Sequence, residues 1–148
     1  MRHSISAIVL DPEDPNTLEG VREALADQPS EIIPCPSEEV LLDTVVSSLV
    51  DVLVISLERP FERSFALLSE IHKRAPEAEV IFVASFDDET LWAWMEVIQR
   101  GAYEFLPKPF QPDELKYHLL QATKKHLPGG FLNDPNSTTL NKGARAGA

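Results

Sequence analysis

Short apolar runs alternate along the chain with longer segments in which apolar residues recur every three or four positions. The apolar runs predict five strands, at residues 5–10, 31–35, 52–55, 79–84 and 103–106. The spaced positions predict five helices, with apolar stripes at Leu18, Val21 and Leu25; Leu41, Leu42, Val45 and Leu49; Phe65, Leu68 and Ile71; Leu91, Met95 and Ile98; and Leu115, Leu119 and Ala122. Because a helix after each strand returns the chain to the same end of the sheet, the strands should pair in parallel. The pattern therefore predicts an α/β fold, a doubly wound parallel five-stranded sheet with helices on both faces.

Residue types at the expected helix ends support these boundaries. Asp14 followed by Pro15 is typical of a helix start, with an acidic N-cap and proline in the first helical position. Ser37 can cap the second helix, and Gly101 can end the fourth because glycine tolerates the backbone conformation that follows many helices. We expect the first helix to span residues 15–27.

Candidate chemistry gathers where the strands end. In an open doubly wound sheet, ligands bind beyond the carboxyl ends of the strands, at the point where the strand order reverses. The residues that reach this edge are Asp11, Glu13, Asp14, Ser56, Ala84, Ser85 and Lys108. The first turn reads DPEDPN at residues 11–16, and so lacks the glycine-rich loop of dinucleotide-binding and P-loop proteins. A small flavodoxin-like enzyme is therefore disfavoured.

Two stretches carry a resemblance to a known family. The more specific is GAYEFLPKPFQPDEL at residues 101–115, in which a Lys-Pro pair follows the fifth strand and leads into the last helix. The other is DVLVISLERP at residues 51–60. Together with the order of the elements, they resemble the receiver domain of bacterial two-component response regulators over residues 4–126. The resemblance implies a flavodoxin-like (βα)5 fold, a role in phosphorelay signal transduction, and often a cis peptide at the Lys-Pro pair.

The resemblance also assigns roles to positions. It implies acidic residues after the first strand that hold a divalent cation, an aspartate ending the third strand that accepts a phosphoryl group, a Thr or Ser ending the fourth, an aromatic residue in the fifth, and a lysine. The corresponding positions are Asp11 and Glu13, Ser56, Ala84, Phe105 and Lys108. Pro12 separates two acids that are adjacent in the family. Ser56 and Ala84 also depart from the pattern.

A serine in the acceptor position changes the expected mechanism. Phosphoryl transfer in this family needs an ionised carboxylate and a cation held partly by it, whereas a serine hydroxyl stays protonated unless a base activates it. Ala84 offers a phosphoryl group no side-chain hydrogen bond. We expect a degenerate receiver that is not an enzyme and has no cofactor beyond weak Mg²⁺ binding through Asp11, Glu13 or Glu58. The alternative is a phosphorelay receiver with altered phosphoryl or cation chemistry at Ser56 or Glu58.

Each pocket residue also has a structural interpretation. Ser56 can hydrogen-bond Lys108 or a backbone group. Asp11 and Glu13 can cap or solvate their loop, and Lys108 can pair with either of them. Glu58 can fold back toward the acidic loop or remain in solvent.

If the pocket is not phosphorylated, contact with other proteins is the remaining function. Trp92 follows Leu91 and is rotated about 100° away from the apolar stripe of the fourth helix, and tryptophans are frequent interface anchors. The resemblance implies a partner or homodimer face formed by the fourth helix, fifth strand and fifth helix. Its candidate residues are Trp92, Trp94, Phe105 and Tyr117. Alternatively, both indoles pack onto the edge of the core. The expected partners are other signalling proteins or a second copy of the chain.

Composition narrows the partners and the location. The chain has 148 residues and a formal net charge of −11, which disfavours direct nucleic-acid binding. Apolar runs are too short to span a membrane and the N-terminus does not read as a signal peptide, so we expect a cytoplasmic protein. Residues 1–126 should form the receiver-like domain, and residues 127–148 a disordered tail or linker. We expect either a stand-alone protein or a fragment cut after the receiver.

Overall fold

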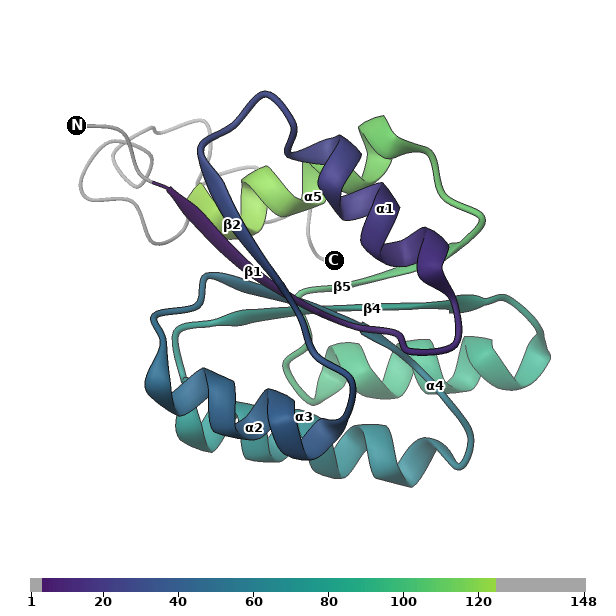
Figure 1. Cartoon of the computed structure of the whole chain (residues 1–148). Coiled ribbons are helices and arrows are strands. Elements are labelled where there is room, and N and C mark those ends of the chain that lie inside the picture. The colour runs from purple at the N-terminus through teal and green to yellow at the C-terminus, as the bar shows by residue number, and fades with distance from the viewer. Residues whose placement is uncertain (1–3, 125–148) are drawn as a thin grey trace, which may run out of the picture.

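The computed structural model describes residues 4–124, which form a sheet of five strands between two layers of helices (Figure 1). The elements are β1 (Ile5–Leu10), α1 (Pro15–Ala24), β2 (Ser30–Pro34), α2 (Glu38–Ser47), β3 (Val52–Ser56), α3 (Phe61–Arg74), β4 (Glu79–Ser85), α4 (Asp88–Gln99), β5 (Glu104–Lys108) and α5 (Pro112–Lys124). The strand order is β2-β1-β3-β4-β5, and every neighbouring pair is parallel. The predicted doubly wound fold is confirmed, with the strand order of flavodoxin-like proteins.

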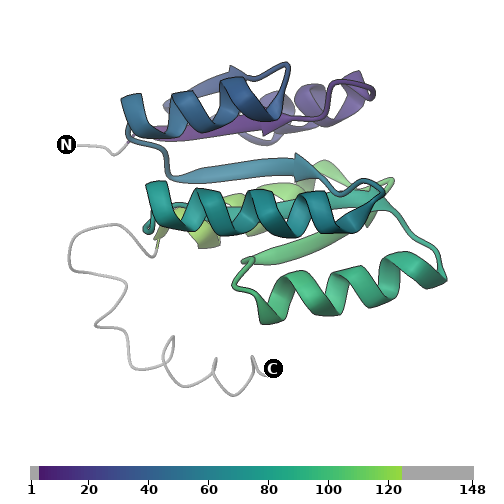
Figure 2. The ribbon, with the colours of Figure 1, turned by 90° about the horizontal axis from the view of Figure 1, so that it is seen from below.

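The two faces of the sheet have separate cores. Helices α1 and α5 cover one face, and α2, α3 and α4 cover the other (Figure 1, Figure 2). Alternate side chains of β3 supply both cores: Leu53 and Ile55 pack toward α2, α3 and α4, whereas Val52 and Val54 pack toward α1 and α5. None of these four residues is more than 1% exposed. Burial on both faces explains why β3 is a continuous apolar run in the sequence.

The register brings the carboxyl ends of the strands to one edge. Leu10 lies beside Ile55, and Ser85 lies beside Lys108. The strand order reverses between β1 and β3, because β2 lies outside β1 while β4 and β5 lie beyond β3. The last residue of β3 is Ser56. The sheet therefore places Ser56 where this architecture binds ligands.

Local chemistry sets the helix boundaries. The Asp14 carboxylate accepts the Asn16 amide at 3.0 Å at the start of α1, and the Ser37 hydroxyl caps α2. Helix α1 ends at Ala24, three residues earlier than expected. Gly101 follows α4 with a φ of 104°, a conformation that favours glycine.

Helix α4 buries a different face from the one predicted. Leu91, Met95 and Ile98 were expected to face the core, but they are 44%, 57% and 39% exposed. The residues that α4 buries are Thr90, Ala93 and Val97. These shorter side chains share the same helical spacing, and Ala93 is completely buried, so the backbone of α4 can approach the sheet closely. The apolar stripe is consequently left in solvent.

The predicted boundary between domain and tail near residue 126 lies outside the described residues. The two ends that the structure does not describe are residues 1–3 and 125–148. Within residues 4–124, no helix has the length and apolar character needed to cross a membrane.

Candidate functional site

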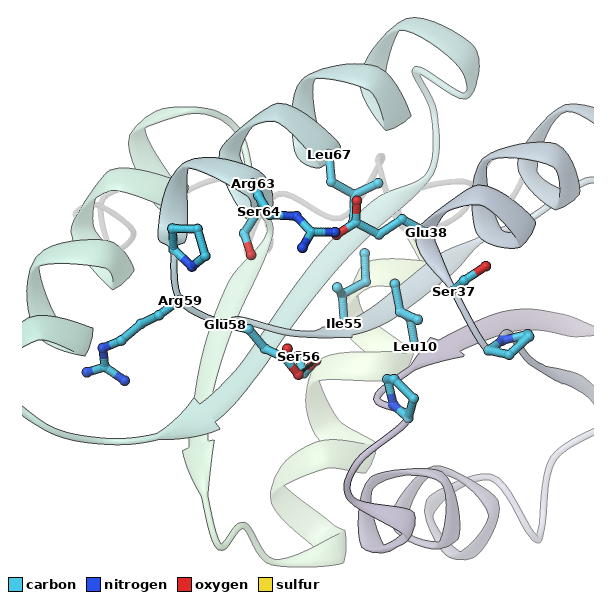
Figure 3. A pocket seen from close by; sticks show the side chains of 13 residues that line it. Leu10, Ser37, Glu38, Ile55, Ser56, Glu58, Arg59, Arg63, Ser64 and Leu67 are labelled. Atoms are coloured by element: carbon cyan, nitrogen blue, oxygen red, sulfur yellow. Dashed lines mark hydrogen bonds and ion pairs between the residues drawn. The ribbon is translucent and has the colours of Figure 1, made fainter.

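A pocket of about 200 Å³ opens at the carboxyl edge of the sheet, between the segments that follow β1, β2 and β3 (Figure 3). We call it the β3 pocket; its lining residues are Leu10, Pro12, Pro36, Ser37, Glu38, Ile55, Ser56, Glu58, Arg59, Pro60, Arg63, Ser64 and Leu67. Asp14, Ser85 and Lys108 line a second pocket of about 460 Å³, between α1 and the segment that follows β5. Residues that the sequence places at one edge are thus divided between two pockets.

Ser56 is held by an acid from its own loop. Its hydroxyl donates to the Glu58 carboxylate across 2.9 Å, and both side chains line the β3 pocket (Figure 3). Glu58 is exposed and bonds the hydroxyl at the end of β3, so its folding back toward the acidic loop stays a prediction. The sequence predicted that Ser56 would hydrogen-bond Lys108 or a backbone group. This prediction is wrong for the Ser56 side chain.

Lys108 is bound by two acids of the loop after β1. Its ammonium donates to Asp11 Oδ2 at 2.7 Å and to Asp14 Oδ2 at 2.8 Å. Asp11 also accepts the hydroxyl of Thr17, a fully buried residue of α1, at 2.7 Å. Pairing with Asp11 was predicted, whereas the second acid is Asp14 and not Glu13, which is exposed. Thr17 gave no signal in the sequence beyond its place one residue before the apolar stripe of its helix.

This cluster shifts the acid–base behaviour of its members. The hydrogen bond from Lys108, together with that from the Asn16 amide, lowers the pKa of Asp14 below its usual value. Burial alone would lower the pKa of Lys108, but hydrogen bonds to Asp11 and Asp14 and their charges raise it overall. Lys108 and Asp14 are therefore both charged across the neutral range.

Arg59 connects the loop after β3 to the start of α4. Its guanidinium donates to Glu89 Oε1 at 2.7 Å and to both carboxylate oxygens of Asp87, at 3.1 and 2.9 Å. Asp87 also caps α4 by accepting the hydroxyl and amide of Thr90, and these bonds, followed by that from Arg59, lower its pKa to about 2. The sequence gave no sign of this connection, because it joins loops 28 residues apart.

The acidic loop does not fit a magnesium ion. Such an ion is held by oxygen ligands, usually including carboxylates. However, Asp11 Oδ2 already accepts hydrogen bonds from Lys108 and Thr17, and β3 ends in a hydroxyl. Among residues 4–124, no group of three or more His, Cys, Asp or Glu side chains is arranged to hold a metal. The Lys108 ammonium is the cationic group that pairs with Asp11 and Asp14.

Comparison with known proteins identifies the family. The sequence model of the response regulator receiver domain family matches residues 8–120 of this chain. The chain belongs to this family. It is a receiver domain of two-component signalling, and the Lys108–Pro109 peptide is cis, as the resemblance implied.

Individual relatives agree with this assignment. The DNA-binding transcriptional regulator NtrC of Klebsiella pneumoniae is 36% identical over 74 residues, which are 50% of this chain and 15% of that protein. A receiver domain structure from Clostridium thermocellum has a TM-score of 0.68 at 23% identity, covering 82% of this chain and 95% of that one. The beryllofluoride-activated NtrC receiver domain has a TM-score of 0.63 at 26% identity, covering 85% and 99%. The chain thus spans a receiver domain but only 15% of the length of the first of these relatives.

Two further receiver positions lie in β4 and β5. Ala84 pairs with Pro107 near the end of β4 and is half-buried, and its methyl group offers no hydrogen bond. Phe105 is 2% exposed, and its ring centroid lies 5.0 Å from that of Trp94. The inclusion of Phe105 in an exposed partner surface is therefore wrong, because its side chain belongs to the core.

Exposed large apolar side chains lie on α4 and at Phe86, which precedes this helix. We call this group the α4 surface; its residues are Phe86, Leu91, Trp92, Met95 and Ile98. Trp92 is 52% exposed, although its ring contacts Phe61 and Phe65 at centroid distances of 6.4 and 5.7 Å. Trp94 is half-buried against the core, and Tyr117 on α5 is 60% exposed. The two indoles thus divide between the two interpretations, one exposed and one packed on the core edge.

Proposed function

We propose that this receiver domain signals without aspartyl phosphorylation and acts as a protein-interaction or dimerisation module. The observation that carries the proposal is the residue at the end of β3. Ser56 presents a neutral hydroxyl, and that hydroxyl is bonded to Glu58 at 2.9 Å. A serine needs an activating base and a positioned donor to act as a nucleophile. None of the histidines among residues 4–124 lines the β3 pocket.

The state of the lysine supports the same proposal. Lys108 is held by Asp11 and Asp14 and lines a different pocket from Ser56. It is therefore not available to a phosphoryl group on Ser56 unless these ion pairs break. Ala84 would add no hydrogen bond to such a group. Neither an available lysine nor a hydroxyl at position 84 would couple phosphorylation to a conformational change.

The α4 surface is the proposed site of contact. Soluble proteins rarely leave contiguous large apolar side chains in water without a binding role. The partner is a second copy of the chain or another cytoplasmic signalling protein. The relative from Klebsiella is a DNA-binding transcriptional regulator, but the charge of −11 argues that this domain acts through a linked or separate output protein. We assign it no catalytic activity.

The proposal is tested by offering a phosphoryl donor. The chain is incubated with Mg²⁺ and either acetyl phosphate or beryllium fluoride, and intact mass and amide NMR shifts are recorded. The NtrC receiver domain, which has a beryllofluoride-activated form, is the positive control. We expect no added mass and no shift changes around Ser56 or α4. A stoichiometric adduct accompanied by shifts along α4 would contradict the proposal.

A second candidate keeps phosphoryl transfer with altered chemistry. The contact between Ser56 and Glu58 favours it, because a carboxylate within 2.9 Å of a hydroxyl can accept its proton. In the same experiment, acid-stable phosphate would indicate phosphoserine, and a hydroxylamine-sensitive acyl phosphate would indicate Glu58. Ser56→Ala and Glu58→Gln variants assign the modified residue.

A further inference from the structure

We propose that Arg59 is a positioning residue for the α4 surface. It fixes the first turn of α4 and the ring of Trp92, and it couples both to the loop that carries Ser56 and Glu58. The sequence has Ala84 where the family resemblance implies a hydroxyl, so a link between the two regions needs another route. The inference rests on the proposed function only in taking the α4 surface as the site of contact.

Arg59 binds two acids at the start of α4. Its guanidinium donates to both carboxylate oxygens of Asp87, at 3.1 and 2.9 Å, and to Glu89 Oε1 at 2.7 Å. Asp87 also accepts the amide and the hydroxyl of Thr90, at 2.8 and 2.7 Å, so Arg59 binds the residue that caps the helix. Because the planar guanidinium binds two acids at once, it fixes the orientation of this turn as well as its distance from the loop.

Arg59 also lies against the aromatic residues that support Trp92. Its Cζ atom lies 5.1 Å from the ring centroid of Phe61, a distance at which a guanidinium is attracted to an aromatic face. Phe61 is buried, and its ring contacts that of Trp92 at 6.4 Å. The second support of Trp92 is Phe65, at 5.7 Å. Arg59 therefore contacts both the cap of α4 and a ring on which the exposed indole rests.

The core by itself holds the start of α4 with little apolar area. The buried residues of α4 are Thr90, Ala93 and Val97, whereas α3 buries six, two of them phenylalanines. Trp94 adds a large ring, half-buried at the edge of the core, but the first turn contributes Thr90 alone to the buried set. Small side chains bury little apolar surface and so stabilise a packed position weakly. Polar links such as that from Arg59 therefore determine where the first turn lies.

Neighbouring side chains of the loop after β3 face different ways. Figure 3 shows Glu58 directed toward Ser56, and Arg59 directed away from them. Glu58 accepts the hydroxyl of Ser56 at 2.9 Å, while Arg59 binds the acids of α4. Since Glu58 and Arg59 are consecutive, a change that moves one shifts the backbone that carries the other. A modification or a contact at Ser56 thus reaches the α4 surface through Arg59.

The first experiment follows the start of α4 in the whole chain. Arg59→Ala should speed amide hydrogen exchange at residues 90–92 by about two- to fivefold, the range expected for lost exposed ion pairs. In a Trp94→Phe background, where Trp92 gives all the tryptophan fluorescence, it should also shift the emission maximum. Arg59→Lys should restore part of both signals, because an ammonium keeps the charge but not the planar geometry. Urea unfolding should change little, since Arg59 and both acids are exposed.

A double-mutant cycle tests the coupling. Ser56→Ala removes the hydroxyl that Glu58 accepts, and its effect on Trp92 emission is measured with Arg59 present and with Arg59→Ala. We expect a change in emission when Arg59 is present and roughly half of it or less when Arg59 is absent. Equal changes in the two backgrounds would overturn the coupling.

Matched variants separate this link from a general effect of charge. Arg22→Ala removes an exposed arginine paired with Glu19 on α1, and Arg63→Ala removes an exposed arginine that approaches Glu38 at 3.5 Å. Neither should change the emission or the exchange. The proposal is overturned if Arg59→Ala leaves both signals unchanged, or if a control variant changes them equally. These signals come from the free chain, so a failure to find any partner would contradict the proposed function and not the role of Arg59.

Discussion

The Lys108 ammonium neutralises a carboxylate that is largely cut off from water. The side chain of Asp11 is 2% exposed and that of Lys108 is 18% exposed. We expect Lys108→Met to lower the free energy of unfolding by about 2–4 kcal/mol, because among residues 4–124 it leaves the buried Asp11 carboxylate with Thr17 as its one side-chain partner. Urea denaturation measures the loss. The control is Lys116→Met, which removes an exposed pair with Asp27 and should cost less than about 1 kcal/mol.

The same residue predicts a window of pH dependence. The folded pKa of Lys108 is raised, so its contribution is fully present below its unfolded value of 10.5 and is lost as pH rises through the folded pKa. The folded pKa of Asp14 is lowered, so its contribution is present above 3.8 and is lost as pH falls through the folded pKa. The stability difference between the wild type and Lys108→Met should be flat between these limits and shrink beyond both. A difference that peaks or vanishes within the neutral range would contradict this assignment.

At the residue scale, the sequence predicted that Asp11 and Lys108 belong to the cluster but did not predict Asp14 and Thr17. Asp11 and Lys108 could be placed together because both lie just beyond or at the ends of strands. The choice of Asp14 over Glu13 could not be predicted, since it depends on the turn in which the Asp14 amide bonds to the Asp11 carbonyl at 3.2 Å. Thr17 was missed because a buried threonine in a helix carries no periodic signal distinct from its apolar neighbours.

At the scale of elements, the end of α4 depends on one glycine. Gly101 has a φ of 104°, and a Cβ placed there would lie 2.8 Å from His72 Cε1 of α3. We expect Gly101→Ala to lower the free energy of unfolding by about 1–2 kcal/mol. The cost should persist in a His72→Ala background, because removing the ring relieves the contact but not the backbone strain. Full recovery in the double variant would show that the contact alone matters. Thermal and urea unfolding of the wild type, the two single variants and the double variant measure the cost of the contact and the cost of the backbone strain.

The face buried by an element was harder to predict than the element itself. The existence of α4 follows from its spacing and from Gly101, and both were read correctly. The large residues Leu91 and Met95 then suggested the wrong inner face. Close approach to a sheet favours small side chains such as Ala93, and a one-dimensional pattern cannot show how near the helix backbone lies. An amphipathic stripe is therefore ambiguous when a second stripe of smaller residues shares its spacing.

At the scale of the whole molecule, the fold was predictable because local and global signals agree. Strands such as 52–55 are apolar throughout, and each strand is followed by an amphipathic helix, which leaves few topologies. The candidate site was predictable only as a set of residues at one edge. Its division into two pockets depends on which side chains pair. Glu58 accepts the hydrogen bond of Ser56, whereas Asp11 and Asp14 accept those of Lys108. No spacing in the sequence encodes that choice.

The α4 surface leads to a prediction about association of the intact chain. Met95 is 57% exposed and lies on the same helix as Trp92. Met95→Glu should leave the free energy of unfolding nearly unchanged but weaken self-association or partner capture at least tenfold, because a charge must then be buried in the contact. Trp92→Ala should act in the same direction, with some loss of stability from its contacts with Phe61 and Phe65.

The control for this prediction is an equally drastic change at an exposed residue outside α4. Leu49 follows α2 and is 95% exposed, so Leu49→Glu alters charge and apolar area without touching α4. Light scattering over a range of concentrations measures self-association, and a pull-down with each variant as bait measures capture of a partner. If the α4 surface is the contact, Met95→Glu loses the interaction and Leu49→Glu keeps it. Equal behaviour of the two variants would move the contact elsewhere on the domain, because the charge added is the same and only its position differs.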